Sequence, residues 1–486
     1  MTGSRLRFTV TGRRTTDEGR NLTVSETRTP NRIESLDEAK LGKTHLRTVV
    51  VAGLGFFADA YDLFVIGIVS TLLKHEWHLG TGQLALLNAV MLGAAFLGAI
   101  VLGRIADKLG RARIFGVIAA AMVVASIGSA LAPSLAVLVG FRFLLGFGVG
   151  GNYPVSAVLM TENANRADRG KLVSLVFSTQ ALGLIVGPLA ALALLGSGAG
   201  DDLTWRLLLG LGAVPAAFVV WLQRRLPEST RFAAAQAAAS VPAQASASAS
   251  APASVTSKVG VKTLFTSRKF LTLLAGTAGC WFLLDYAYYG NTISTPQIVG
   301  LISPNASDSA TIAIELAIFV IAAVPGYALA ILKMDRIGHR RLQLAGFVMM
   351  GVCFAVIGLV PGMTTMVIPF LIAYGISYFF SEFGPNVTTF VLPGEVFPAS
   401  VRATGHGIAA GTGKLGAFIG VFLFPLLQNS LGLRGTLLLT GGVSVLGALL
   451  TLVLPEPAGR SLEEVSGDTG VAMIAADPDQ AVPQAA

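Results

Sequence analysis

The chain has 486 residues, of which 53% are hydrophobic and only 13% are charged, and its formal net charge is +8. Because roughly 25% of the residues of a soluble domain are charged, this composition excludes an ordinary soluble protein. Nor does the positive charge indicate nucleic-acid binding, since the basic residues fall in alternate loops between apolar segments, as membrane topology requires. We therefore expect a lipid bilayer, and no nucleic acid, as a partner.

The apolar segments predict an all-α integral membrane protein. A membrane span needs about 20 apolar residues, and twelve segments meet this requirement. They lie near residues 48–73, 82–103, 113–132, 135–161, 171–196, 204–223, 269–301, 311–332, 342–361, 364–392, 402–428 and 435–454. An even number of spans with basic residues in alternate loops predicts a multi-pass plasma-membrane protein with both termini in the cytoplasm.

Three polar stretches divide the chain into two halves. Residues 1–46 are basic, have no early apolar core, and predict a disordered cytoplasmic tail without a cleavable signal peptide. Residues 226–264 include a tract rich in Ala, Ser and Pro that predicts a flexible cytoplasmic linker. Residues 457–486 predict a second disordered tail. We expect two six-helix bundles, over residues 47–225 and 265–456.

The two predicted halves echo each other. Residues 107–113 and 335–341 both read D-[KR]-x-G-[RH]-x-R, and in each half a glutamate precedes an arginine by seven residues. Duplicated halves are the usual build of secondary transporters, whose substrate site lies between them. We expect the paired charges to act in gating: Asp107, Arg111, Glu162, Arg169, Asp335, Arg336, Glu395 and Arg402.

Two acidic residues lie inside the first predicted span. Asp59 and Asp62 are three residues apart and share one face of a helix. Since two close carboxylates cannot easily both ionise at low dielectric, they are candidate proton carriers, although either one could instead pair structurally with a basic residue. Arg142 in the fourth span needs an anionic or carbonyl partner, for which Asp59 is one candidate.

Polar residues in later spans predict a central site. Trp281, Asp285 and Tyr289 are four residues apart and share one helix face, which should line a cavity because a carboxylate facing lipid is costly. Lys414 lies too deep in its span to reach the interface easily. The glycines before Tyr153 predict a weakened helix or close packing, Gln180 is a polar residue in the fifth span, and Gly384-Pro385 should break the tenth span beside Asn386.

Several of these segments resemble the phosphate:proton symporter family of the major facilitator superfamily. The similar segments are GFFADAYDLF, GGNYPVSAVLMTE, WFLLDYAYYG, FGPNVTTFVLPGEVFP and RATGHGIAAGTGKLGA. The resemblance implies the major facilitator fold, with 12 transmembrane helices in two six-helix halves, and a proton pathway through Asp59 with Asp62 close by. It also implies a phosphate site formed by Tyr153, Gln180, Trp281, Asp285, Tyr289, Asn386 and Lys414.

Two positions depart from that family pattern. Asn152 stands where the family usually has an acid, which puts the proton stoichiometry in doubt, and Glu382 stands where an amide or neutral residue is common. Our hypothesis is that Glu382 takes over as a proton-coupling residue.

The expected function is proton-coupled import of inorganic phosphate by alternating access. Dihydrogen phosphate can donate a hydrogen bond to Asp285, whereas sulfate cannot. The alternatives are a major facilitator symporter for another solute (a sugar, an aromatic acid or an organophosphate) and a phosphate-sensing receptor with little transport. The chain has no metalloprotease, nucleophile-elbow or P-loop motif, so we expect no enzyme activity, cofactor or metal.

Overall fold

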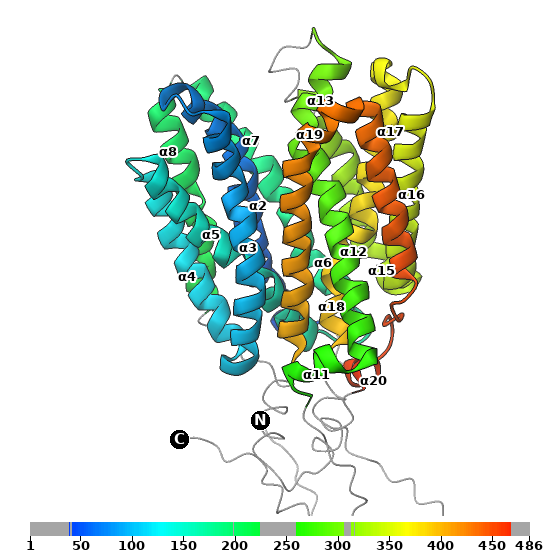
Figure 1. Cartoon of the computed structure of the whole chain (residues 1–486). Helices are drawn as coiled ribbons and strands as arrows, with labels where there is room; N and C mark the ends of the chain where they lie inside the picture. The colour runs from blue at the N-terminus through cyan, green and yellow to red at the C-terminus, as the bar shows by residue number, and fades with distance from the viewer. Residues whose placement is uncertain are drawn as a thin grey trace, which may run out of the picture.

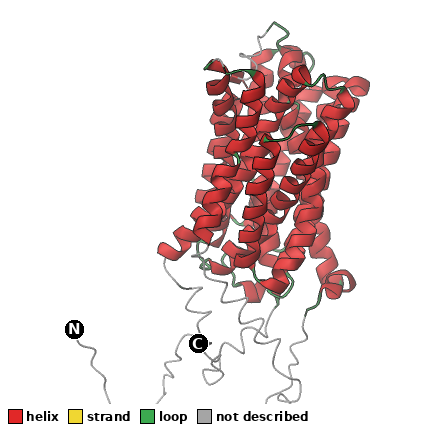
Figure 2. Ribbon diagram, turned by 90° about the vertical axis from the view of Figure 1, so that its left-hand side faces the viewer, coloured by secondary structure: helices red, strands yellow, loops and turns green. Residues whose placement is uncertain are grey.

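The computed structural model describes residues 38, 41–197, 199–223, 259–305, 313–314 and 316–467. Every regular element in these residues is a helix, and Figure 2 shows the helices running roughly parallel over the height of the molecule. Eleven helical segments are long and apolar enough to cross a membrane. With α2 (Lys43–Glu76), which has 34 residues and runs the height of the first bundle in Figure 1, they form the twelve predicted spans.

The helices form two bundles. The first consists of α2, α3 (Thr81–Leu109), α4 (Arg111–Ala130), α5 (Leu135–Asn163), α6 (Arg169–Ser178), α7 (Gln180–Gly196), α8 (Asp201–Leu211) and α9 (Ala213–Gln223). The second consists of α11 (Val261–Thr266), α12 (Arg268–Ile293), α13 (Thr295–Ile302), the π-helix η2 (Phe319–Ala323), α15 (Val324–Ile337), α16 (His339–Leu359), the short 3₁₀ helix η3 (Met363–Thr365), α17 (Val367–Phe383), α18 (Pro385–Val396), α19 (Arg402–Thr451) and α20 (Leu462–Ser466).

The bundles meet mainly along three helices of each. Helix α3 packs on α19, α5 packs on α18 and α19, and α6 packs on α15 and α18. We call the end of the molecule that carries α11 and α20 the lower end, and the end that carries α13 the upper end, as in Figure 1.

The tenth span is broken where the sequence predicted. Helix α17 ends at Phe383 and α18 begins at Pro385, with the non-helical Gly384 between them. Proline lacks the N–H that would continue the helix, and Gly384 lies so close to Gly346 that a Cβ would be 2.7 Å from its Cα. The break therefore brings α16 against α17 and α18 just before Asn386.

The glycines of the fourth span do not weaken its helix, which was one of the two effects expected of them. Helix α5 runs unbroken from Leu135 to Asn163, although Pro154 lies inside it. A Cβ on Gly146 or Gly150 would collide with the backbone of α3. The glycines thus serve close packing between helices, which small residues permit in membranes.

Two predicted boundaries need correction. Helix α11 overlaps the end of residues 226–264, predicted as linker, and α20 lies within the predicted tail 457–486. Both are held by packing, because Leu264 of α11 and Leu462 of α20 are fully buried. Sequence hydropathy misses such short helices because they lie beside the bundle ends and do not span them. Most of residues 1–46, 226–264 and 457–486 lie outside the described residues, so the predicted disorder there stays a prediction.

Candidate functional site

Lys414 is the centre of a buried cluster between the two bundles. Its Nζ donates to Oδ2 of Asp285 at 3.1 Å and to the Tyr289 hydroxyl at 3.0 Å. It also lies 4.4 Å from the ring centroid of Tyr153, which comes from the opposite bundle. The side chains of Lys414 and Asp285 are each only 2% exposed. A cation, a carboxylate and two phenols thus meet in a place shielded from water.

The close approach of α19 to α12 positions this cluster. A Cβ on Gly413 would overlap the Trp281 ring, and a Cβ on Gly416 or Gly420 would collide with the backbone of α12. These glycines let α19 lie against the helix that carries Trp281, Asp285 and Tyr289. The predicted shared face of α12 is therefore turned toward Lys414, and the Trp281 side chain interacts with the Asp285 carboxylate.

An aromatic layer borders the cluster. Phe177 of the first bundle stacks on Phe390 of the second with ring centroids 4.6 Å apart, and Phe56 packs edge-on against Phe390 at 5.0 Å. Tyr153 and Trp281 lie against the same rings, at 6.3 Å each from Phe390. The layer joins the two bundles by apolar contacts alone, which can separate without leaving a buried charge unpaired.

Gln180 and Asn386 both donate to the hydroxyl of Tyr327, a residue that was not predicted to belong to the site. The Gln180 amide donates to the Tyr327 hydroxyl at 2.7 Å, and the Asn386 amide donates to the same oxygen at 2.9 Å. Asn386 also donates to Glu382. A single tyrosine in the apolar run 316–332 gave no signal in the sequence, because only the fold brings α15 against α6 and α7.

The predicted phosphate residues thus fall into two neighbouring groups. Tyr153, Trp281, Asp285, Tyr289 and Lys414 form one, and Gln180 and Asn386 with Tyr327 form the other. Tyr289 lies close enough to Tyr327 for the two hydroxyls to interact electrostatically, which makes the groups adjacent.

Asn152, which stands at the position where an acid was expected, holds Asp59. The Asn152 amide donates to Oδ2 of Asp59 at 2.9 Å, and its own oxygen accepts from the Ser156 hydroxyl at 2.6 Å. Asn152 is thereby fixed with its donor toward Asp59. A Cβ on Gly55 would lie 2.8 Å from the Asn152 nitrogen, so Gly55 provides the space for this contact.

Arg142 does not pair with Asp59, so that suggested pairing is wrong. Its guanidinium donates to the backbone carbonyl of Asp62 at 3.2 Å and contacts the Met91 sulfur at 2.9 Å, and the charge that acts on it is that of Asp62. Asp59 and Asp62 leave α2 toward different helices, since Asp62 lies against Gly212 between α8 and α9. Both carboxyl groups are buried.

At the lower end, one charged cluster joins the bundles through the start of α19. Asp107 accepts from the backbone N–H groups of Ala403 at 3.1 Å and Thr404 at 2.6 Å. Glu162 bridges the two bundles, since it lies 3.3 Å from Arg111 and 3.1 Å from Arg402. A carboxylate at a helix N-terminus is stabilised by the unpaired N–H groups and the helix dipole.

A second cluster repeats this arrangement with the roles of the bundles exchanged. Asp335 accepts from the backbone N–H groups of Gly170 at 2.9 Å and Lys171 at 2.7 Å, at the start of α6. His339 lies between Asp335 at 3.2 Å and Glu395 at 2.7 Å. Arg169 donates to the backbone carbonyl of Arg460 in the second bundle.

The second cluster differs from the predicted gating set at one position. Arg336 lies exposed, outside the cluster, and His339 takes the place corresponding to Arg111. The repeated motif contained this signal, because its [RH] position aligns Arg111 with His339. The structure therefore brings together seven of the eight predicted gating residues in two matching clusters.

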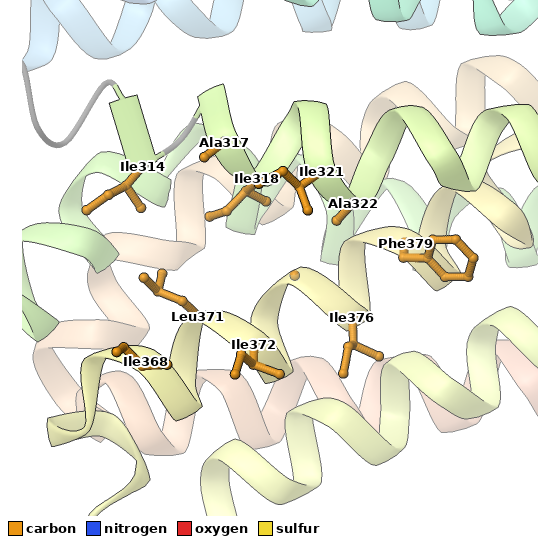
Figure 3. Close-up of a pocket in the computed structure, with 11 residues that line it drawn as sticks. Ile314, Ala317, Ile318, Ile321, Ala322, Ile368, Leu371, Ile372, Ile376 and Phe379 are labelled. Atoms are coloured by element: carbon orange, nitrogen blue, oxygen red, sulfur yellow. The ribbon is translucent and has the colours of Figure 1, made fainter.

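A large opening in the molecule lies away from Lys414 and is apolar. A cavity of about 520 Å³ lies between α17 and the segment carrying Ile314 and Ile318, as Figure 3 shows, and every residue that lines it is apolar. Such a lining offers no donor to a polar solute. Among the described residues no group of His, Cys, Asp and Glu side chains has the arrangement of a metal site.

Residues 48–468 match the family described as "Sugar (and other) transporter". The chain belongs to this family. Its relatives in the family include the probable inorganic phosphate transporter 1-6 of Arabidopsis thaliana, which is 36% identical over 90% of this chain and 96% of the relative. The inorganic phosphate transporter 1-6 of Oryza sativa subsp. japonica is 35% identical over 93% and 97% of the two chains. The low affinity inorganic phosphate transporter 1 of Petunia hybrida is 34% identical over 89% and 95%.

The fold of this family member is that of the major facilitator superfamily. The proton:xylose symporter XylE, bound to 6-bromo-6-deoxy-D-glucose, superposes with a TM-score of 0.75 over 87% of this chain and 98% of its own, at 20% identity. The expected fold class is confirmed.

Proposed function

We propose that the chain imports inorganic phosphate together with protons, by alternating access between two states of the bundles. The buried cluster of Lys414 with Asp285, Tyr289 and Tyr153 is the observation that carries this proposal. The relatives named as inorganic phosphate transporters support it, since they match nearly the full length of the chain.

The chemistry of the cluster suits dihydrogen phosphate. Lys414 supplies the positive charge, and the hydroxyl, amide and indole groups nearby can donate to the anion's oxygens. Asp285 can accept a hydrogen bond from a protonated oxygen of the anion, whereas a sulfate oxygen would only repel it. When phosphate binds, it takes over the contacts that Lys414 makes with Asp285 and Tyr289 in this structure.

Asp59, Asp62 and Glu382 are the proposed proton-coupling groups. All three are buried, and burial of a charge in the membrane is costly unless it is compensated. Asp59 is held by the Asn152 amide and Glu382 by the Asn386 amide, so neutral donors can solvate either carboxylate. Asp62 faces Arg142, which can compensate its charge.

The two charged clusters at the lower end are the proposed gate. Each ties a carboxylate of one bundle to the first N–H groups of a helix in the other, so opening the lower end would break both. We place the lower end and both termini in the cytoplasm and the protein in the plasma membrane, on the distribution of basic loops. In this reading the chain is a carrier with no enzyme activity.

A sugar is the second candidate substrate, because the matched family includes sugar transporters by its description and XylE has the same fold. The buried Lys414–Asp285 ion pair argues for an anion that carries a proton. A neutral sugar gains little from two opposite charges that already satisfy each other.

The proposal is tested by uptake into proteoliposomes that contain the purified protein. We expect uptake of radiolabelled phosphate to rise as the outside is acidified. Arsenate should compete with this uptake, whereas sulfate and xylose should leave it unchanged. Competition by xylose with no uptake of phosphate at any pH would replace the proposal by the sugar alternative. Phosphate binding without uptake would favour the receptor.

Replacing Glu382 by glutamine should reduce the dependence of phosphate uptake on external pH. The amide keeps the size of the side chain and removes its ability to release a proton. Uptake at several external pH values measures the effect, with Glu76→Gln, an acid near the outer end of α2, as the matched control. A pH dependence equal to that of the unmodified protein would exclude Glu382 from coupling.

A further inference from the structure

A thread of buried hydroxyl groups runs down from the upper end of the second bundle. At the first residue of α13, the Thr295 hydroxyl lies 3.2 Å from that of Tyr374 and 3.3 Å from that of Tyr378. Tyr378 donates to the Thr292 hydroxyl at 2.9 Å, and Tyr374 donates to the backbone carbonyl of Asn291 at 3.3 Å. Hydroxyls are both donors and acceptors, so the thread is able to relay protons.

The thread ends at a small cavity inside the same bundle. The cavity has a volume of about 10 Å³, and polar residues on its lining are Tyr288, Asn291, Ser377, Tyr378 and Ser381, together with the apolar Ala287, Met350 and Phe354. The Asn291 side-chain oxygen and the Ser381 hydroxyl are buried there without a hydrogen-bond partner. A cavity with two to four polar neighbours needs at least about 10–15 Å³ to hold a water, so this one is just large enough for a single water.

Glu382 lies at the far side of this cavity. The Tyr288 hydroxyl lies beside the Glu382 carboxyl and interacts with it. The polar groups that face Glu382 are all neutral: Tyr288 from α12, Tyr327 from α15 and Asn386 from α18. No ion pair recorded among the described residues includes it, in contrast to Asp285, which pairs with Lys414.

Glu382 is also connected to the other bundle. The Tyr327 hydroxyl accepts from both Gln180 and Asn386, which occupies its two lone pairs and leaves its hydrogen to point at Glu382. A change in the charge of Glu382 therefore acts on the Tyr327–Gln180 bond, which crosses between the bundles.

We propose that this thread is a second proton route, which leads from the upper end of the second bundle through one bound water to Glu382. The water donates to Tyr288 as it takes up a proton from above, and Tyr288 passes its own hydroxyl hydrogen to the carboxylate. Only O–H bonds form and break, and one proton is gained by Glu382 for each proton taken from the upper side. The route rests on the proposed function, since it supplies protons for coupled uptake.

The test separates proton entry from phosphate handling. Uptake driven by an inward proton gradient needs protons to enter, whereas exchange of phosphate for phosphate at equal pH needs no net proton movement. In Tyr288→Phe we expect gradient-driven uptake to fall at least about tenfold, as for loss of a proton-transfer group, while exchange is retained. Ser381→Ala, which removes one neighbour of the water, should act in the same direction.

The matched control is Tyr61→Phe, which removes a buried hydroxyl that donates to Leu208 in the first bundle and should retain both activities. If Tyr288→Phe and Ser381→Ala keep the gradient-driven uptake of the unmodified protein, the route is overturned and the proposed function stands. Loss of both activities in both variants would assign these residues to the substrate site and also overturn the route. An unmodified protein without gradient-driven uptake would overturn the proposed coupling, and the route with it.

Discussion

Lys414→Ala should abolish phosphate binding. Lys414 supplies the positive charge of the cluster, and it holds both Asp285 and Tyr289 through its Nζ. In binding, truncating one partner of a buried hydrogen-bonded charge pair costs about 2–5 kcal/mol or more. Since each 1.4 kcal/mol is a factor of about ten, a loss in the middle of this range lowers affinity by at least about a hundredfold. Equilibrium binding of radiolabelled phosphate to the purified protein measures this.

The single variant also leaves Asp285 buried without its cation, which could unfold the protein. Lys414→Ala combined with Asp285→Asn removes that problem, because no buried charge then lacks a partner. We expect the double variant to unfold near the temperature of the unmodified protein and still to bind no phosphate.

Lys269 provides a matched control at the lower end. Its Nζ donates to the backbone carbonyl of Ser466 at 3.1 Å, far from the cluster. Lys269→Ala should therefore bind phosphate normally. Unchanged affinity in a folded Lys414→Ala protein would show that the phosphate site lies elsewhere.

Asp107→Ala should open the lower end of the molecule. The Asp107 carboxylate holds two backbone N–H groups of α19 and lies 3.1 Å from Arg111. Hydrogen bonds to charged groups contribute about 1.5–3 kcal/mol each. Asp107→Ala removes these bonds only from the state whose lower end is closed, so the equilibrium shifts toward the state whose lower end is open. Asp335→Ala should act in the same way on α6.

Thr161 offers a place to measure this opening. It is fully buried where α5 meets α18, and a Cβ on Gly394 would lie 2.8 Å from its hydroxyl. In Thr161→Cys, with Cys280 and Cys353 replaced by serine, we expect Asp107→Ala to raise the rate of maleimide labelling at least about tenfold, as a shift of 1.4 kcal/mol would.

Asp202→Asn is the control, because Asp202 forms an exposed ion pair with Arg206 in the first bundle. It should leave the labelling rate unchanged, since exposed pairs contribute about 0–1 kcal/mol. Equal labelling of Thr161→Cys with and without Asp107→Ala would show that the first cluster does not hold the lower end closed.

Much of the candidate site could be predicted from single segments. The spacing of Trp281, Asp285 and Tyr289 placed them on one face, and the depth of Lys414 in its span required a partner. The pairing of Lys414 with Asp285 agrees with both requirements. Phosphate as the ligand of these residues stays a prediction.

The partners of other residues could not be predicted in this way. Arg142 faces Asp62 and not Asp59, although the two acids are only three residues apart, because it packs against the turn of α2 whose backbone carbonyl at Asp62 it binds. Tyr327 gave no signal, since its importance arises only where α15 meets α7. His339 was part of a repeated motif, but its contacts with Asp335 and Glu395 depend on how α16 starts.

The sequence by itself determined the number of spans, the division into two halves and the apolar segments in which polar residues are buried. These follow from hydropathy and residue spacing, which act over one or two turns of helix and need no neighbouring segment. Only the tertiary structure decided which other buried polar groups meet across helices: Gln180 with Tyr327, Asp107 with the start of α19, and Tyr288 with Glu382. Those contacts join residues far apart in the chain, and they depend on the close helix packing that glycines such as Gly413 and Gly150 permit.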